Sequence, residues 1–323
     1  MRRRKFICLF GGGTLAWWPA AQAQQPVKPR RIAFVHTGIP VSELTPASRT
    51  YWIRRFYAEL RALGHAEGAG LVVERFSAEG STARFATLAA EVVGRKPEVI
   101  LSNSNSLVGV LMKATASIPI VGIMGDPIAD GLTTNLARPG RNLTGVSIDG
   151  GPGIFAKRLQ ILREAVPAAA KVTYLVGTRA ELQRSNIAAT NRLLEEVNDE
   201  QLRRTFAELA QDGTKAVVMS DSGSFLASRA LIIELAAKHR LPAIYAYRQF
   251  AEVGGLLAYG PELGELAKRM AQNVHQILGG TKAGDIPIYQ PTVFELVINL
   301  KTAKALGLTI PQAVLAQADE VIE

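Results

Sequence analysis

Cysteine, long apolar runs and the motifs of common enzymes are scarce or missing in this sequence. The one cysteine in 323 residues is Cys8, so the rest of the chain can form no disulfide, use no thiol nucleophile and hold no metal through cysteine. Beyond the first 25 residues no apolar run is long enough to cross a membrane. There is no Gly-x-Ser-x-Gly, no His-Glu-x-x-His, no phosphate-binding loop and no Gly-x-Gly-x-x-Gly after the first predicted strand. The sequence therefore predicts neither an enzyme nor a metal or cofactor site.

Charge of one sign is not concentrated beyond the first few residues. The chain has 37 Lys and Arg against 28 Asp and Glu, and four of the basic residues stand at positions 2–5. The other basic residues are scattered along predicted helices, which argues against a nucleic-acid-binding surface. We therefore expect no nucleic-acid partner.

The first 23 residues have the three parts of an export signal. Basic residues at positions 2–5 precede an apolar stretch too short to span a bilayer, and small residues follow up to Ala23. We expect cleavage after Ala23 and a periplasmic protein of residues 24–323. The consecutive arginines followed by Phe6 favour the twin-arginine route over the Sec route. A retained membrane anchor is the alternative, but no stop-transfer pattern follows.

Short β-branched runs alternate with segments of helical period along the rest of the chain. Residues 31–36 have the pattern of a strand, and residues 48–63 have that of a helix with Trp52 and Phe56 on one face. The alternation restarts with a strand at residues 171–176. Such a pattern predicts βαβ units and parallel sheets in two α/β domains that face each other across a cleft. Trp52 is expected away from that cleft.

Polar side chains follow the predicted strands of both halves. Because ligands of open parallel sheets bind at the carboxyl ends of the strands, we predict a ligand site in these loops. Hydroxyls and amides near helix N-termini suit a small carboxylate or zwitterion, and Asp126 would receive a ligand amine. Ser and Asn before a helix are also typical N-caps, so a purely structural role is the alternative, as it is for His36. The predicted ligand-binding residues are Thr37, Ser102, Ser104, Ser106, Asp126, Ser147, Thr178, Ser220, Ser222 and Tyr245.

Several long segments carry a family resemblance: residues 3–12, 56–64, 118–121, 125–127, 138–146, 290–311 and 318–322. On these segments the chain resembles the substrate-binding proteins of ABC importers, in the family that includes the tryptophan-binding TrpX-type proteins. Two loops depart from the family pattern. Residues 102–106 replace a small-residue loop with Thr-Pro, and residues 177–180 replace an Asn-Pro-rich loop. Both loops border the predicted cleft, so the resemblance implies the fold but not the identity of the ligand.

The resemblance implies a type I periplasmic-binding-protein fold, with two Rossmann-like domains joined by three crossings. The first domain would comprise residues 30–147 and 258–282, and the second residues 148–257 and 283–323. The crossings would lie near residues 145–147, 255–258 and 288–292.

The function implied by the resemblance is non-catalytic. The protein, expected to be a monomer without cofactor or metal, would bind a small solute, an amino acid or related carboxylate, and deliver it to the transmembrane subunits of an ABC permease. One alternative is a binding module that feeds a membrane sensor. The other is an exported α/β enzyme, for which His36 and Asp126 are the only isolated acid–base candidates.

Overall fold

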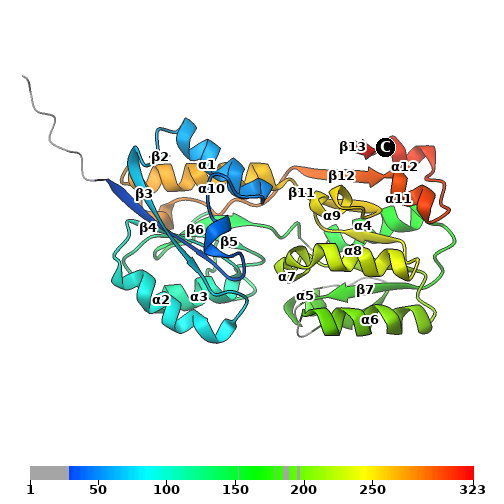
Figure 1. Cartoon of the computed structure of the whole chain (residues 1–323). Coiled ribbons are helices and arrows are strands. Elements are labelled where there is room, and N and C mark those ends of the chain that lie inside the picture. Colours follow the sequence, from blue (N-terminus) through cyan, green and yellow to red (C-terminus); the bar gives the residue numbers. More distant parts are fainter. Residues whose placement is uncertain (1–28, 152, 178, 185–188, 195–196) are drawn as a thin grey trace, which may run out of the picture.

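Two α/β domains, each built on one sheet, make up the protein (Figure 1). The computed structural model describes residues 29–323 apart from 152, 178, 185–188 and 195–196. The predicted signal peptide and Thr178 lie outside the described residues. No helix in the described ranges is both long and apolar enough to cross a membrane.

The first sheet has the strand order β2-β3-β1-β4-β5-β6, with every pair parallel. Its strands are β1 (Arg30–His36), β2 (Ala66–Glu67), β3 (Gly70–Ser77), β4 (Val99–Asn103), β5 (Ile120–Met124) and β6 (Leu143–Ser147). The helices of this domain are η1 (Val41–Glu43), α1 (Tyr51–Ala62), η2 (Thr82–Arg84), α2 (Phe85–Gly94), α3 (Asn105–Ala114), α10 (Leu263–Leu278) and η3 (Ala283–Asp285). The parallel sheet with crossover helices confirms the predicted α/β class.

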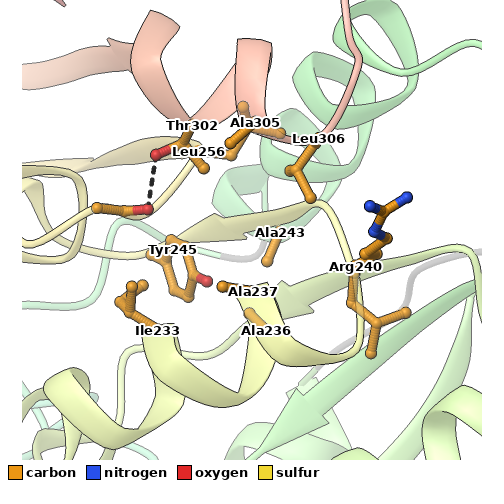
Figure 2. A pocket seen from close by; sticks show the side chains of 12 residues that line it. Ile233, Ala236, Ala237, Arg240, Ala243, Tyr245, Leu256, Thr302, Ala305 and Leu306 are labelled. Atoms are coloured by element: carbon orange, nitrogen blue, oxygen red, sulfur yellow. Dashed lines mark hydrogen bonds between the residues drawn. The ribbon is translucent and has the colours of Figure 1, made fainter.

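The second sheet has the order β13-β12-β11-β10-β9-β7-β8, in which β12 runs antiparallel to β11. Its strands are β7 (Val172–Val176), β8 (Thr190–Leu193), β9 (Ala216–Met219), β10 (Ala243–Tyr245), β11 (Leu257–Pro261), β12 (Phe294–Asn299) and β13 (Glu320–Ile322). The helices are α4 (Gly153–Ala165), α5 (Arg179–Arg184), α6 (Asp199–Gln211), α7 (Gly223–Ala227), α8 (Arg229–Lys238), α9 (Arg248–Glu252), α11 (Leu300–Ala305) and α12 (Gln312–Leu315). A cavity lies between α8, β10 and α11 (Figure 2).

The domain limits in the structure differ from the predicted limits at two places. Residues 258–261 belong to β11 of the second sheet, so the chain returns to the first domain only at Glu262. Residues 283–288 still pack on the first domain, where the Gly140 amide donates to Gly284 O at 3.0 Å and the Ile288 amide donates to Leu136 O at 2.8 Å. The third crossing therefore follows residue 288.

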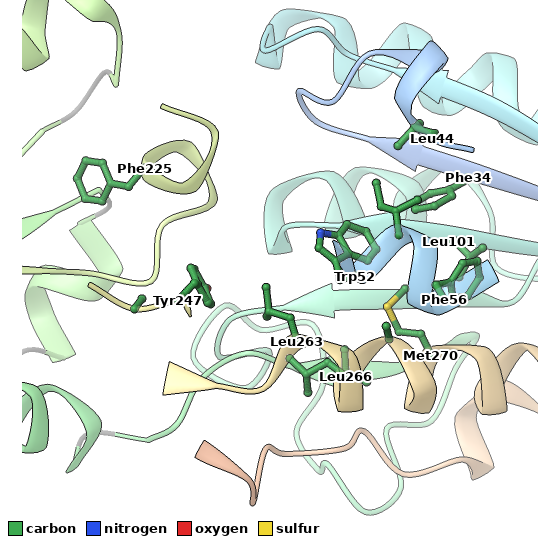
Figure 3. Packing of buried hydrophobic residues seen from close by; sticks show 14 of the residues in the cluster. Phe34, Leu44, Trp52, Phe56, Leu101, Phe225, Tyr247, Leu263, Leu266 and Met270 are labelled. Carbon is green, nitrogen blue, oxygen red and sulfur yellow. The ribbon is translucent and has the colours of Figure 1, made fainter. Parts of the chain in front are cut away.

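The core of the first domain is built where α1 and α10 cover one face of the sheet (Figure 3). Apolar residues recur in α10 at helical spacing, from Leu266 to Met270 and beyond, and so form one buried stripe. Opposite them, the ring of Phe34 meets that of Phe56 edge-on at 5.8 Å. The same hydrophobic cluster includes Tyr247 of the second domain, so the apolar packing is continuous between the domains.

Main-chain hydrogen bonds tie the three crossings together. The Ser147 amide donates to Tyr289 O at 2.7 Å, and the Glu262 amide donates to Val293 O at 3.3 Å. Glycine is required just before the first crossing, because a Cβ on Gly145, whose φ is +145°, would stand 2.0 Å from the carbonyl oxygen of the neighbouring strand. Short linked crossings of this kind can act as hinges that absorb backbone rotation.

Candidate functional site

Asparagine side chains hold together the loops that leave the first sheet. The Thr37 amide donates to Asn103 Oδ1 at 2.8 Å, and Asn103 Nδ2 donates back to Thr37 Oγ1 at 2.9 Å. Asn105 Oδ1 accepts from the Gly125 amide at 2.9 Å, and its Nδ2 donates to Asp126 O at 3.2 Å. The ends of β1, β4 and β5 are therefore joined into one polar edge.

Ser104 stands at the N-terminus of α3 in an unusual conformation. Its φ of +68° is rare for a residue with a side chain, and the turn is held by its amide, which donates to Ile123 O at 2.9 Å. Ser104 Oγ accepts from the Leu107 amide at 3.4 Å and lies 3.2 Å from Ser106 Oγ. The amides of Asn105 and Ser106 make no hydrogen bond within the described residues. A helix N-terminus with unused amides favours an anion.

An imidazole and an indole form the apolar part of this edge. The His36 ring stacks on Trp52, with 6.3 Å between ring centroids and 27° between planes. His36 Nδ1 accepts from the amides of Gly38 and Ile39 at 3.0 and 2.8 Å. Burial lowers the pKa of His36 to about 3, so the ring is neutral at physiological pH. Trp52 therefore lies beside the end of β1, because the strand end at His36 reaches the helix that carries it.

The other predicted residues of the first domain have identifiable local roles. Asp126 Oδ1 accepts from the Ile128 and Ala129 amides at 3.0 Å each, as in a capped turn. Ser147 is buried, and its hydroxyl donates to Gly125 O at 2.7 Å. Ser102 is buried within β4. Asp126 and Ser147 therefore stabilise the loops of the polar edge.

In the second domain a buried carboxylate joins the loops that follow β7 and β9. Glu181 of α5 accepts from Ser220 Oγ at 2.8 Å and from the Gly177 amide at 3.1 Å. Gly177 is needed because a Cβ there would approach Ser222 Oγ to 2.5 Å. Ser220 and Ser222 thus lie at one edge, as predicted from their place after a strand.

A buried ion pair supports the residue between these two serines. Asp221 Oδ1 lies 2.5 Å from a guanidinium nitrogen of Arg158, whose side chain is wholly buried. Arg158 Nε also donates to Tyr259 O at 2.7 Å, and Tyr247 Oη donates to Asp221 O at 2.8 Å. Burial, reinforced by the Asp221 carboxylate, raises the pKa of Tyr247, so this hydroxyl keeps its proton. No group in the described part of the chain donates a hydrogen bond to Asp221 Oδ2.

Tyr245 is the predicted site residue that the structure places elsewhere. Its side chain is buried and stacks on Phe250, with 4.6 Å between ring centroids and 5° between planes. It lines the cavity between α8, β10 and α11 (Figure 2). The prediction fails because side chains alternate across a strand, and Tyr245 takes the side covered by α8.

Sequence reasoning missed several polar residues of these two edges. Asn103 and Asn105 lie in the loop of residues 102–106 but are not among the predicted contacts, and Asp221 lies between two serines that are. Arg158 left a usable signal, because a charged residue on an otherwise apolar helix face requires a buried partner. Its partner is distant in sequence and could not be named. Among the described residues, no cluster of three or more His, Cys, Asp or Glu is placed to hold a metal ion.

Comparison with known proteins gives a consistent family assignment. A family model described as ABC transporter substrate binding protein matches residues 48–322. A curated relative, the tyrosine-binding protein of Clostridioides difficile, is 23% identical over 267 residues, which are 78% of this chain and 75% of the relative.

Solved structures share the fold at low sequence identity. A conserved domain protein from Vibrio cholerae superposes with a TM-score of 0.80 at 22% identity, covering 91% of this chain and 100% of that chain. An ABC domain from Streptococcus pneumoniae in complex with L-Trp gives a TM-score of 0.78 at 19% identity, with the same coverage of both chains. A substrate-binding protein from Agrobacterium vitis with bound allitol gives 0.56 at 14% identity, covering 90% and 98%.

Proposed function

Because this chain belongs to the family of ABC transporter substrate-binding proteins, we propose that it binds one amino acid between its two domains and delivers it to an ABC permease. In this proposal the N-terminal signal directs export to the periplasm. The observation that carries the choice of an amino acid is a pair of complementary polar edges, one suited to an anion and the other to a cation.

The carboxylate of the amino acid is assigned to the first domain. The unused amides at the start of α3 and the hydroxyls of Ser104 and Ser106 are donors, and donors at a helix N-terminus stabilise an anion. The strained φ of Ser104 is consistent with a binding role, because such strain persists mostly where function requires it. Thr37 borders the same edge and is retained as a proposed contact.

The ammonium group is assigned to Asp221 of the second domain. One oxygen of this carboxylate is held by buried Arg158, which leaves Oδ2 to accept a hydrogen bond from the ligand. A charge-assisted bond of this type is among the stronger protein–ligand contacts. The role first predicted for Asp126 therefore passes to Asp221, because Asp126 Oδ1 already caps a turn. Ser220 and Ser222 flank Asp221 and are retained as proposed lining residues.

Aromatic rings beside both edges favour an aromatic or branched side chain on the ligand. Trp52 lies against His36 on the first domain, and Tyr247 belongs to the same hydrophobic cluster from the second domain. Two similar proteins, the tyrosine-binding protein of Clostridioides difficile and the ABC domain in complex with L-Trp, support the same class. Binding then favours a closed arrangement only to the extent that the ligand contacts both domains at once.

Isothermal titration calorimetry on residues 24–323, unfolded and refolded to remove any bound solute, tests this proposal. We expect saturable binding of one or more aromatic or branched L-amino acids and none of sugar alcohols such as allitol. Asp221→Asn should weaken binding at least tenfold, because it removes a charged acceptor. Asp221→Asn also leaves buried Arg158 unpaired, so Arg158→Met/Asp221→Asn serves as a second variant that lacks both charges and should bind as weakly.

Asp126→Asn is the matched control, since it keeps an oxygen for the turn at the other edge. We expect its affinity to stay within about threefold of the unaltered protein, which is under 1 kcal/mol. Binding lost in Asp126→Asn but kept in Asp221→Asn would contradict the assignment of the amine. Delivery is tested by deleting the gene and measuring uptake of the bound amino acid, which a sensor module would leave unchanged.

A further inference from the structure

We propose that the second domain carries a separate site for a small aromatic carboxylate, in the cavity between α8, β10 and α11 (Figure 2). This site goes beyond the proposed function, because none of the groups assigned to the amino acid lines it. The cavity has a volume of about 250 Å³. Apolar cavities of roughly 150 Å³ stay dry and bind benzene, so this one is large enough for a single ring with a substituent.

The walls of the cavity are mostly apolar. They come from one face of α8, the start of β11 and one face of α11, and include Ile233, Ala236, Ala237, Leu256, Ala305 and Leu306. Small alanine side chains on both helices leave the space open. Such a lining favours a flat hydrocarbon ring over a sugar or a peptide.

A tyrosine hydroxyl inside the cavity lacks a partner. Tyr245 is 1% exposed, and Figure 2 shows its hydroxyl turned toward Ala237 inside the cavity. No hydrogen bond to this hydroxyl is made by the residues that the structure describes. Burial raises the pKa of Tyr245, so the hydroxyl remains a donor at neutral pH. The hydroxyl is not among the buried polar atoms that are cut off from solvent, so it opens into the cavity, where an oxygen of a ligand can replace water as its acceptor.

A cation stands at the rim of the same cavity. Arg240 follows the C-terminal end of α8 with a φ of +51°, and its exposed side chain lies beside the apolar walls (Figure 2). In the described part of the chain no carboxylate forms an ion pair with Arg240. An arginine that is free to pair, together with the inner hydroxyl, selects an anionic end on the ligand. The combination of apolar walls and two donors points to an aromatic carboxylate.

Benzoate, titrated into residues 24–323 labelled at the isoleucine and alanine methyl groups, is the direct probe. We expect saturable NMR shifts of the Ile233, Ala236 and Ala237 methyl signals. Tyr245→Phe keeps the stack on Phe250 and removes only the hydroxyl, so affinity should fall about two- to tenfold. Arg240→Gln should weaken binding by a similar factor.

Two further variants separate binding in the cavity from binding at the surface. Ala305→Leu adds volume from an exposed helix position and should abolish the shifts without unfolding the protein. Lys238→Gln removes a neighbouring positive charge of α8 that does not line the cavity, and should leave the affinity unchanged.

The proposal would be overturned by shifts that persist in Ala305→Leu, by shifts confined to other methyl groups, or by equal binding of uncharged benzyl alcohol. Loss of the benzoate shifts in Arg158→Met/Asp221→Asn would place the probe at the amino-acid site instead. Retention of these shifts in that double variant would support a separate site, whether or not the proposed function holds.

Discussion

At the scale of single residues, His36 couples folding to pH. Burial lowers the pKa of His36 to about 3, whereas an unfolded histidine titrates near 6.5. The neutral ring therefore contributes stability above pH 6.5, and this is lost as the pH falls toward 3. Between pH 7.5 and 5.0 the free energy of unfolding should fall by about 2 kcal/mol more in the unaltered protein than in His36→Asn. Urea unfolding of both proteins at both pH values measures the difference. An equal change in the free energy of unfolding in the two proteins would contradict the lowered pKa of His36.

Also at this scale, Arg158 and Asp221 should be strongly coupled. Asp221→Asn leaves a wholly buried guanidinium without its counter-charge, which costs about 3–5 kcal/mol in comparable cases. Arg158→Met/Asp221→Asn should be more stable than Asp221→Asn alone, since no buried charge is left over. Denaturant unfolding of the two single variants and the double variant gives the coupling energy. If the stability losses of the two single variants add up to the loss of the double variant, the ion pair contributes nothing to stability.

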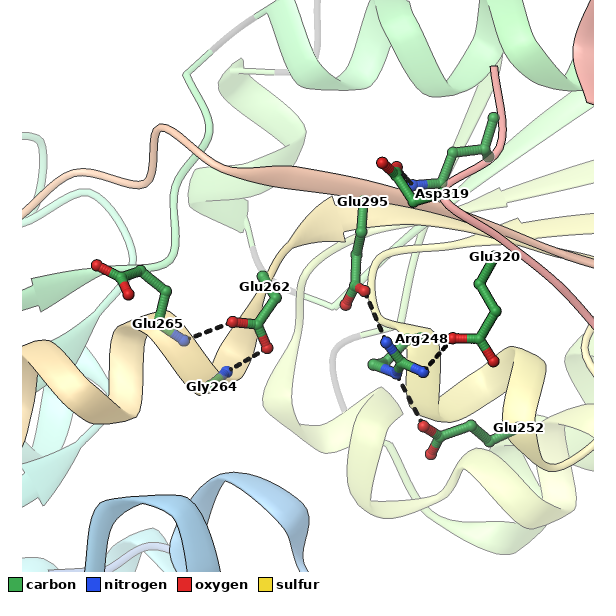
Figure 4. Close-up of polar contacts among 9 residues, drawn as sticks. Arg248, Glu252, Glu262, Gly264, Glu265, Glu295, Asp319 and Glu320 are labelled. Atoms are coloured by element: carbon green, nitrogen blue, oxygen red, sulfur yellow. Dashed lines mark hydrogen bonds and ion pairs between the residues drawn. The ribbon is translucent and has the colours of Figure 1, made fainter. Parts of the chain in front are cut away.

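At the scale of elements, the Glu262 side chain caps α10 where the chain re-enters the first domain (Figure 4). Its two carboxylate oxygens accept from the Gly264 and Glu265 amides at 2.7 and 2.6 Å. Glu262→Ala should destabilise the protein by about 1 kcal/mol, the usual cost of losing a cap. Glu262→Gln keeps an acceptor oxygen and should lose less, as measured by urea unfolding. Equal losses in both variants would show that the cap is not what stabilises this helix.

Arg248 joins three elements at the outer edge of the second sheet (Figure 4). It pairs with Glu252 of α9 at 2.9 Å, Glu295 of β12 at 2.8 Å and Glu320 of β13 at 2.5 Å. Burial raises the pKa of Glu295, and Arg248 opposes that rise.

Arg248→Met should therefore raise the pKa of Glu295 further. A raised pKa in the folded state means that stability is lost as the pH increases through it. We expect the loss in free energy of unfolding to be larger at pH 7 than at pH 5, by about 1 kcal/mol or more. Part of the lost stability should return in Arg248→Met/Glu295→Gln. Unfolding curves at the two pH values test this, and a destabilisation that does not depend on pH would exclude Glu295 as its source.

At the scale of the whole molecule, local patterns predicted the architecture better than the site. Helical period and short apolar runs indicated two α/β halves, because strand and helix patterns follow directly from which faces are buried. The second crossing was placed too early, because the run that ends at Tyr259 pairs with β12, a strand far along the chain.

Position after a strand was sufficient to place Ser104 and Ser220 at the loop edges, where both stay proposed contacts. Asp221 could not be singled out, because its environment depends on Arg158, which is more than 60 residues away in sequence. Tyr245 was misplaced because the face of a strand that a side chain takes depends on register, which sequence reasoning left unassigned.

Small-angle X-ray scattering on residues 24–323 shows whether the two domains close over an amino acid. Scattering is measured without ligand and with the tightest-binding amino acid at saturation. We expect a smaller radius of gyration with the amino acid, and no change with allitol at the same concentration. Saturating amino acid that leaves the scattering curve unchanged would contradict closure, and with it the proposed place of the ligand between the domains.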